Sequence, residues 1–149
     1  MGGEKTSVDP HRERVLDSDF PYSAVRPVQG RLVCILDARS TRRGMQLEIH
    51  PSRALCTGEI HELALTDEAG AAPGERVERV SYVGFVEIAQ GGVVVAGEPV
   101  TVGARELGRV IGFDCTHFPN HMNILIRGAP WQTGKDMGAE LEDQVRFSF

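Results

Sequence analysis

Apolar residues recur along the chain at the intervals that β-strands produce, with hardly any trace of a helical period. Residues 31–37 (RLVCILD) form a short apolar run rich in β-forming residues, which predicts a buried strand. In residues 45–50 (MQLEIH), apolar and polar side chains alternate strictly, which predicts a strand with one buried face. A further strand is expected within residues 58–70, before a turn-rich segment.

Residues 75–92 predict one long strand with an interruption. Gly84 lies in the middle of this segment and predicts a bulge or a sharp bend, because glycine inside a strand marks irregular pairing. One face of the strand is expected to carry Val80, Tyr82, Val86 and Ile88. Five shorter strands are expected after it, separated by glycine-containing turns: GVVVA, PVTV, LGRVIGFD, HMNILIRG and QVRFSF.

This pattern predicts an all-β protein with a single domain. About nine short strands in 149 residues are typical of a small β-barrel, with a β-sandwich as the alternative. A disordered tail is expected over residues 1–10, and the barrel domain over residues 11–149. The domain begins with an irregular lead-in, in which Pro21 and Pro27 interrupt any helix.

The composition allows a substantial core and argues against two classes of partner. With 149 residues, of which 41% are hydrophobic, the chain is large enough to bury a core. The formal net charge of -5 argues against a nucleic-acid-binding protein. No apolar segment reaches the length of a signal-peptide core or a membrane span. We therefore expect a cytoplasmic protein that binds neither nucleic acid nor membranes.

A tight basic cluster and the cysteines add little chemistry. Residues 39–43 (RSTRR) are typical of a solvated turn, with the binding of an anionic ligand as the alternative. Cys34, Cys56 and Cys115 have no C-x-x-C spacing, so neither a disulfide framework nor a structural zinc site is expected.

The strongest candidate for chemistry is the stretch 112–128 (GFDCTHFPNHMNILIRG), where polar residues crowd between two apolar runs. His117 and His121 are four residues apart, but Pro119 between them disfavours a helix, so a wide loop is expected. Within such a loop the two imidazoles can converge, and Asp114 at the strand end can orient one of them.

This loop is compatible with two kinds of chemistry. Two histidines and a carboxylate are ligands that zinc, iron or another divalent metal accepts. Without metal, His117, His121 and Asp114 can serve as general acids and bases. Asn120 and Asn123 can then donate hydrogen bonds to a carbonyl or a developing oxyanion. The alternative without a function is the polar tip of a β-hairpin.

Other side chains can extend this predicted site. His50 and His61 are candidate third or fourth metal ligands. His61 shares a strand face with Leu63 and Leu65, which is more typical of a core histidine with its ring nitrogens hydrogen-bonded. The residues expected to bind substrate are Tyr82, Phe85, Arg127 and Trp131. Trp131 alternatively closes one end of the barrel.

The leading functional hypothesis is an enzyme of lyase, isomerase, cyclase or hydrolase type that acts on a small organic molecule, with the loop at the barrel mouth. Its chemistry would use acid/base groups or a divalent metal, since no signature of a nucleotide, flavin or Schiff-base cofactor is visible. The alternative is a non-catalytic ligand-binding or accessory assembly barrel. RNA binding is a weaker third option. A homodimer also stays open, because exposed strand edges can pair between copies.

Overall fold

The computed structural model describes residues 20–128 and 131–149. The tail expected over residues 1–10 lies outside the described residues, and so does the start of the lead-in. The described part of the lead-in, residues 20–27, has no regular structure. No helix occurs in the described residues, and hence none that could span a membrane.

Eleven strands make up the described fold. They are β1 (Val28–Ser40), β2 (Met45–Gln46), β3 (Ser52–Leu55), β4 (Ile60–Thr66), β5 (Arg76–Val77), β6 (Val80–Gln90), β7 (Gly92–Val95), β8 (Pro99–Val102), β9 (Arg105–Asp114), β10 (Asn123–Arg127) and β11 (Gln144–Phe147).

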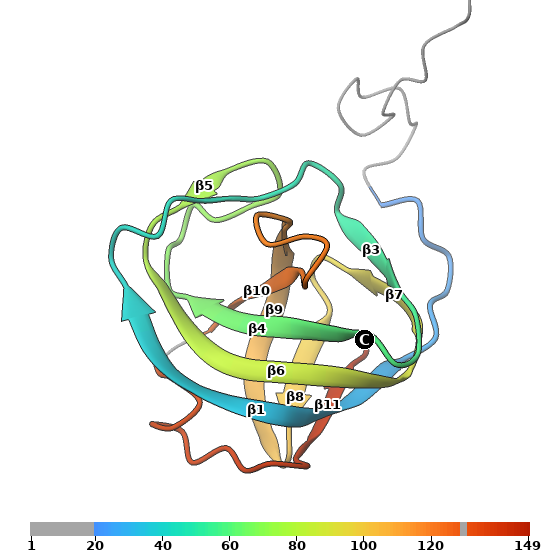
Figure 1. Ribbon diagram of the computed structural model, residues 1–149. Coiled ribbons are helices and arrows are strands. Elements are labelled where there is room, and N and C mark those ends of the chain that lie inside the picture. The colour runs from blue at the N-terminus through green and yellow to red at the C-terminus, as the bar shows by residue number, and fades with distance from the viewer. Residues whose placement is uncertain (1–19, 129–130) are drawn as a thin grey trace, which may run out of the picture.

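Seven of these strands close into a barrel in the order β1-β11-β8-β9-β10-β4-β6 (Figure 1). All neighbours that pair in the barrel are antiparallel except β10 and β4, which are parallel. The strands β2 and β5 form a separate two-stranded sheet, and β3 and β7 form another. The prediction of a single all-β barrel is confirmed, and the sandwich alternative is wrong.

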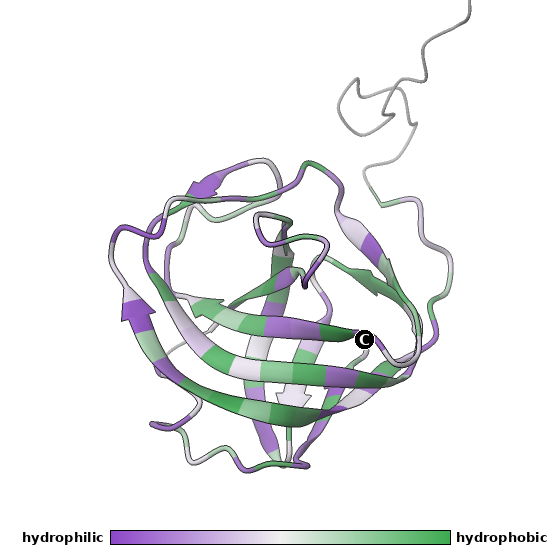
Figure 2. Ribbon diagram, in the orientation of Figure 1, coloured by the Kyte–Doolittle hydropathy of each residue, from purple (hydrophilic) through white to green (hydrophobic). Residues whose placement is uncertain are grey.

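Two hydrophobic cores lie on opposite faces of the barrel wall. The first core draws residues from all seven barrel strands, so it fills the barrel interior. On β10, Ile124 and Ile126 belong to this interior core, whereas Leu125 between them belongs to the second. The second core therefore lies outside the wall, where Met45 and Val77 of the β2–β5 sheet cover it. Figure 2 shows the hydrophobic residues along β1, β4 and β6, interrupted by shorter hydrophilic stretches.

The alternating segment 45–50 is a strand only at its beginning. Met45 and Leu47 are buried in the outer core, so the predicted burial pattern holds. Strand pairing, however, is limited to Met45–Gln46. Beyond it, the backbone N–H of Leu47 bonds to the carbonyl of Glu75, and that of Glu48 bonds to the carbonyl of Phe113. The strand prediction was too long because these amides bond to separate segments rather than to one neighbouring strand.

Gly84 marks a bulge in β6, as the sequence predicts. Leu63 of β4 pairs with Gly84, but the next residue, Ala64, pairs with Tyr82, so Val83 is an extra residue on β6. A Cβ atom on Gly84 would lie 2.2 Å from the carbonyl oxygen of Cys34. Glycine is required here because the strands approach too closely for any side chain.

The bulge reverses which face of β6 each side chain occupies. Val80 and Tyr82 pack with the outer core, whereas Val86 and Ile88 belong to the interior core. The prediction that these four residues share one face is therefore wrong. The extra residue shifts the alternation by one position, because side chains along a strand alternate with a period of two.

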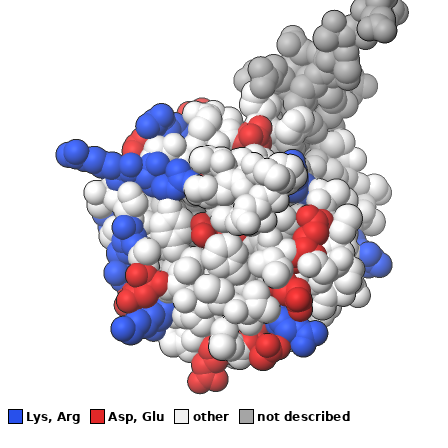
Figure 3. Space-filling model, viewed as in Figure 1, with Lys and Arg blue, Asp and Glu red and all other residues white. Residues whose placement is uncertain are grey.

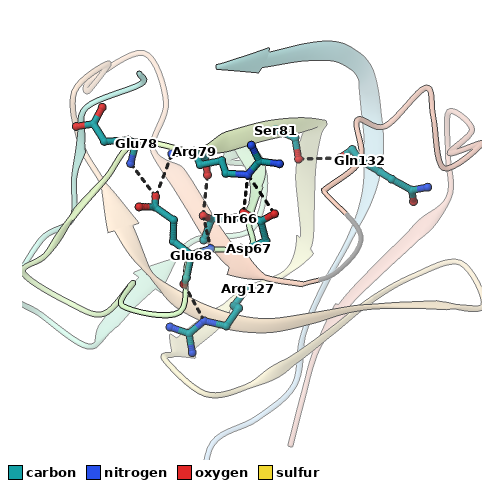
Figure 4. A network of polar contacts seen from close by, with 8 residues as sticks. All are labelled: Thr66, Asp67, Glu68, Glu78, Arg79, Ser81, Arg127 and Gln132. Carbon is teal, nitrogen blue, oxygen red and sulfur yellow. Dashed lines mark hydrogen bonds and ion pairs between the residues drawn. The ribbon is translucent and has the colours of Figure 1, made fainter. Parts of the chain in front are cut away.

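A polar network holds the connection from β4 to β6 (Figure 4). The carboxylate of Glu68 accepts the backbone N–H groups of Glu78 and Arg79 at 2.8 and 2.9 Å. The hydroxyl of Thr66 donates to the carbonyl of Arg79 and accepts the N–H of Glu68. Arg127 donates to the carbonyls of Glu68, Ala69 and Ala71. These bonds fix a turn that carries the chain away from the barrel wall and back.

Candidate functional site

Four polar and aromatic positions line up across the outer face of the barrel wall. Asp114 of β9 pairs with Asn123 of β10, which pairs with Glu62 of β4, which in turn pairs with Phe85 of β6. Asn123 lies two residues from Leu125 of the outer core, so this row faces outward. The candidate site thus lies on the outer face of the wall, beside the β9–β10 loop. The hypothesis from the sequence instead placed it at the mouth of the barrel.

Asp114 is a buried carboxylate held by three side chains. It accepts hydrogen bonds from Asn123 Nδ2 at 2.7 Å, from the Thr116 hydroxyl at 2.6 Å and from Arg43 Nη2 at 3.4 Å. Only 2% of the residue is exposed to solvent. These three bonds hold the Asp114 carboxylate in place at one end of the row.

Arg43 crosses the row and joins Asp114 to Tyr82. Its Nε donates to the phenol oxygen of Tyr82 at 2.8 Å, while Nη2 faces Asp114. The Arg43 side chain is 16% exposed. Arg39, from the same basic cluster, pairs with Asp136 instead. The cluster predicted as a solvated turn thus contributes one arginine to the site.

Glu62 lies at the centre of the row. The residue is 8% exposed, and burial raises the pKa of its carboxyl group to about 7, with Arg43 opposing the rise and Asp114 adding to it. Among the described residues, no side chain or backbone group donates a hydrogen bond to this carboxyl group. Its Oε2 lies 3.9 Å from Nε2 of His121. Glu62 is therefore a carboxyl group that can be either charged or neutral near pH 7.

His121 is held over the row by its neighbours. Asn120 Nδ2 lies 2.7 Å from Nδ1 of the ring, and because an amide nitrogen can only donate, Nδ1 accepts and the neutral ring carries its proton on Nε2. The edge of Phe85 contacts the ring at a centroid distance of 5.0 Å. Nε2 is buried and has no hydrogen-bond partner among the described residues. Burial, followed by the charges of His117 and His61, lowers the pKa of His121.

His61 has both ring nitrogens bonded, as expected for a core histidine. Its Nδ1 accepts the backbone N–H of Met122 at 3.1 Å, so Nε2 carries the proton and donates to Glu59 at 3.0 Å. The residue is 5% exposed. His61 therefore fastens the end of the loop that carries His121 to β4.

The histidines do not assemble into a metal site in the described part of the chain. No group of three or more His, Cys, Asp or Glu side chains there has an arrangement that could hold a metal ion. The rings of His117 and His121 lie 5.2 Å apart, and His117 is exposed. His50 lines a separate surface hollow with Glu48 and Arg53. The zinc or iron hypothesis gains no support from this arrangement.

Only two of the four residues predicted to bind substrate lie at the candidate site. Tyr82 and Phe85 both face outward onto the row, because the bulge between them brings them to the same face. Arg127 instead holds the turn after β4. Trp131 stacks against the guanidinium of Arg79, 3.8 Å from its ring centroid, with Arg39 at 5.6 Å.

Two site residues were not singled out from the sequence. The signal for Glu62 is its place in residues 60–66 (IHELALT), two positions before Ala64 in a strand whose members beyond Ile60 are all buried. Arg43 had no signal beyond the basic cluster, since its role depends on how residues 41–44 fold over the wall. On the face seen in Figure 3, charges of both signs are interspersed.

Comparison with known proteins places the chain in a family without assigning it a function. No curated protein and no solved structure matches the chain. A family model, described as a family of unknown function (DUF6917), matches residues 22–148, which include all eleven strands. The chain belongs to this family.

Proposed function

We propose that this protein is an enzyme that acts on a small organic molecule by acid/base chemistry, with Glu62 as the group that takes and returns a proton. The reaction would be of lyase, isomerase, cyclase or hydrolase type, since these need only proton transfer. The observation that carries the proposal is a buried carboxyl group that accepts no hydrogen bond from the described residues and whose pKa is raised to about 7. A general acid or base is most effective when its pKa lies near the working pH.

His121 is the proposed partner of Glu62 in proton transfer. Nε2 of its neutral ring carries the proton and lies 3.9 Å from Oε2 of Glu62, which is longer than a hydrogen bond. Both groups therefore keep hydrogen-bonding capacity for the same bound molecule. While Glu62 takes a proton from one atom of the substrate, His121 can donate a hydrogen bond from Nε2–H to another atom.

The remaining residues of the row are proposed to position these two groups. Asn120 fixes the tautomer of His121, and Asn123 fixes Asp114. The Asp114 carboxylate holds Arg43 in place, and its charge adds to the rise in the pKa of Glu62 that burial causes. In this proposal the imidazole of His117 is dispensable, because the residue is exposed and the ring lies beside the ring of His121 without a hydrogen bond to it.

The test is a search for proton-transfer activity with matched variants. Wild-type protein is incubated in D₂O with a panel of small carbonyl compounds, esters, hydroxy acids and amides, and each mixture is followed by ¹H NMR for exchange or conversion. The Glu62→Gln variant should lose roughly 100-fold or more of any activity found, the usual contribution of a general base. Glu106→Gln is the control, since Glu106 is exposed on β9. Full activity in a folded Glu62→Gln variant would contradict the proposal, and binding without turnover would favour the non-catalytic alternative.

A further inference from the structure

We propose that Arg43 and Tyr82 form a pair of hydrogen-bond donors for a carbonyl oxygen, so that the substrate is a small carbonyl compound with an acidic C–H group next to the carbonyl. The inference rests on the proposed function, because it names the substrate class of the same site. It is supported by the hydrogen bond between the two side chains and by the N–H and O–H donors of each that no described residue accepts.

The hydroxyl proton of Tyr82 is free to be donated. Arg43 Nε donates to the phenol oxygen at 2.8 Å, so that oxygen already serves as an acceptor. A phenol has one proton to give, and none of the described residues accepts it. A donated bond from a cation also polarises the phenol O–H group, which makes it a stronger donor.

The guanidinium group of Arg43 has N–H donors that no described residue accepts, and its hydrogen bonds to Tyr82 and Asp114 hold it in place. A guanidinium group has five N–H donors, and the structure commits one to Tyr82 and one to Asp114. The remaining N–H groups have no acceptor among the described residues. Because the side chain is anchored at both ends and is only 16% exposed, its free donors have a fixed direction in a largely desolvated place.

The donor pair and Glu62 lie on the same outer face of the barrel wall. Tyr82 pairs with Ala64, and Glu62 lies two residues before Ala64 on β4, so both side chains project from the outer face. Arg43 lies close enough to influence the charge of Glu62. A bound molecule in contact with Glu62 can therefore place an oxygen against the donors of Arg43 and Tyr82.

The charges of the site are compatible with a neutral carbonyl group. Asp114 offsets the charge of Arg43, which leaves donors without a large net positive field. The Glu62 carboxylate would take a proton from the carbon next to the carbonyl. The electron pair of that C–H bond would form a C=C bond, and the carbonyl π pair would move to the oxygen, giving an enolate. Return of the proton from Glu62 to carbon would restore the carboxylate, so no further reactant is needed.

The experiment uses 4-nitrophenol as a probe for an oxyanion, because its ionised form is seen directly by absorbance. Wild-type protein should bind the phenolate form more tightly than the neutral phenol. Tyr82→Phe, which removes a single hydroxyl group, should weaken phenolate binding roughly tenfold, and Arg43→Met should weaken it at least as much. Tyr22→Phe and Arg42→Met are the matched controls and should bind as wild type, since Tyr22 bonds to Ser52 and Arg42 is exposed.

The outcomes separate this inference from the proposed function. Absence of phenolate binding, or equal binding by wild type and a folded Tyr82→Phe variant, would overturn the donor pair whatever the activity of the enzyme. The Glu62→Gln variant should keep phenolate binding, because it leaves both donors intact. If that variant also kept full activity, the acid/base proposal would fail while the donor pair would stand as an oxygen-binding site.

Discussion

The imidazole of His61 and the backbone amide of Met122 are joined by a hydrogen bond of 3.1 Å, which connects β4 to the loop before β10. His61→Leu would keep an apolar side chain of similar size but leave the buried Met122 N–H without an acceptor. We expect a loss of roughly 1–3 kcal/mol in the free energy of unfolding, measured by urea denaturation. Hydrogen exchange at the Met122 amide should become faster.

The matched control for this change is His117→Leu in the same loop. His117 is exposed, so its replacement should change the free energy of unfolding by less than about 0.5 kcal/mol. Equal effects of the two substitutions would mean that His61 does not hold the loop.

The raised pKa of Glu62 predicts that its contribution to the free energy of unfolding falls as pH rises. Burial raises the pKa of the folded carboxyl group from 4.5 to about 7, so the folded state binds its proton more tightly than the unfolded state. This contribution is fully present below about pH 4.5 and is lost as pH rises through about 7. Its size is roughly 1–3 kcal/mol after allowance for solvent screening. The Glu62→Gln variant should lose this part of the pH dependence in urea unfolding between pH 4.5 and 8.5. An unchanged pH profile would show that Glu62 titrates normally in the folded protein.

The close approach of the strands at Gly84 predicts that the bulge of β6 does not accept a side chain at this position. In Gly84→Ala the new Cβ would meet the Cys34 carbonyl oxygen at 2.2 Å, so the strands must separate. We expect a loss of about 1–3 kcal/mol, together with a change in the environment of Tyr82 visible by NMR. Gly70→Ala is the control, because a Cβ there meets nothing within 4 Å, and it should be neutral within about 0.5 kcal/mol. Similar stability of both variants would argue against the close approach.

Replacement of Arg127 is predicted to lower the stability of the fold without weakening the binding of 4-nitrophenolate. Arg127→Met would remove the donor of the Ala69 and Ala71 carbonyls, while the Glu68 carbonyl would keep the N–H of Ala71, and we expect a cost of roughly 1–3 kcal/mol in thermal or urea unfolding. The affinity for 4-nitrophenolate should stay at the wild-type value. A selective loss of affinity would instead return Arg127 to the substrate-binding role suggested by the sequence.

The fold class could be predicted because strand alternation is a local signal. Residues 31–37 and 58–66 alternate or stay apolar over enough positions to identify β4 and part of β1 without any knowledge of their partners. The length of β2 could not be predicted in this way, since the amides after Gln46 bond to segments far along the chain. The local sequence pattern therefore predicts which side chains are buried, but not which strands pair.

The candidate site was only partly predictable. Asp114, His121 and Asn123 were found because they crowd into one short stretch of sequence. Glu62 and Arg43 come from other parts of the chain and join the row through strand register and a folded-over segment. The bulge at Gly84 was predicted, but its effect, placing Tyr82 and Phe85 on one face, depends on which residue is left unpaired.

The pairing of β1 with β11 has a consequence for synthesis of the protein. Val28 pairs with Phe147, so one edge of β1 has no barrel partner until residues 144–147 have left the ribosome. During that interval residues 28–31, at the start of β1, lack their β11 partner, and their backbone N–H and C=O groups can pair with a neighbouring chain. Co-translational aggregation should therefore depend on how quickly the last strand is delivered, and a chaperone that covers β1 would protect the nascent chain.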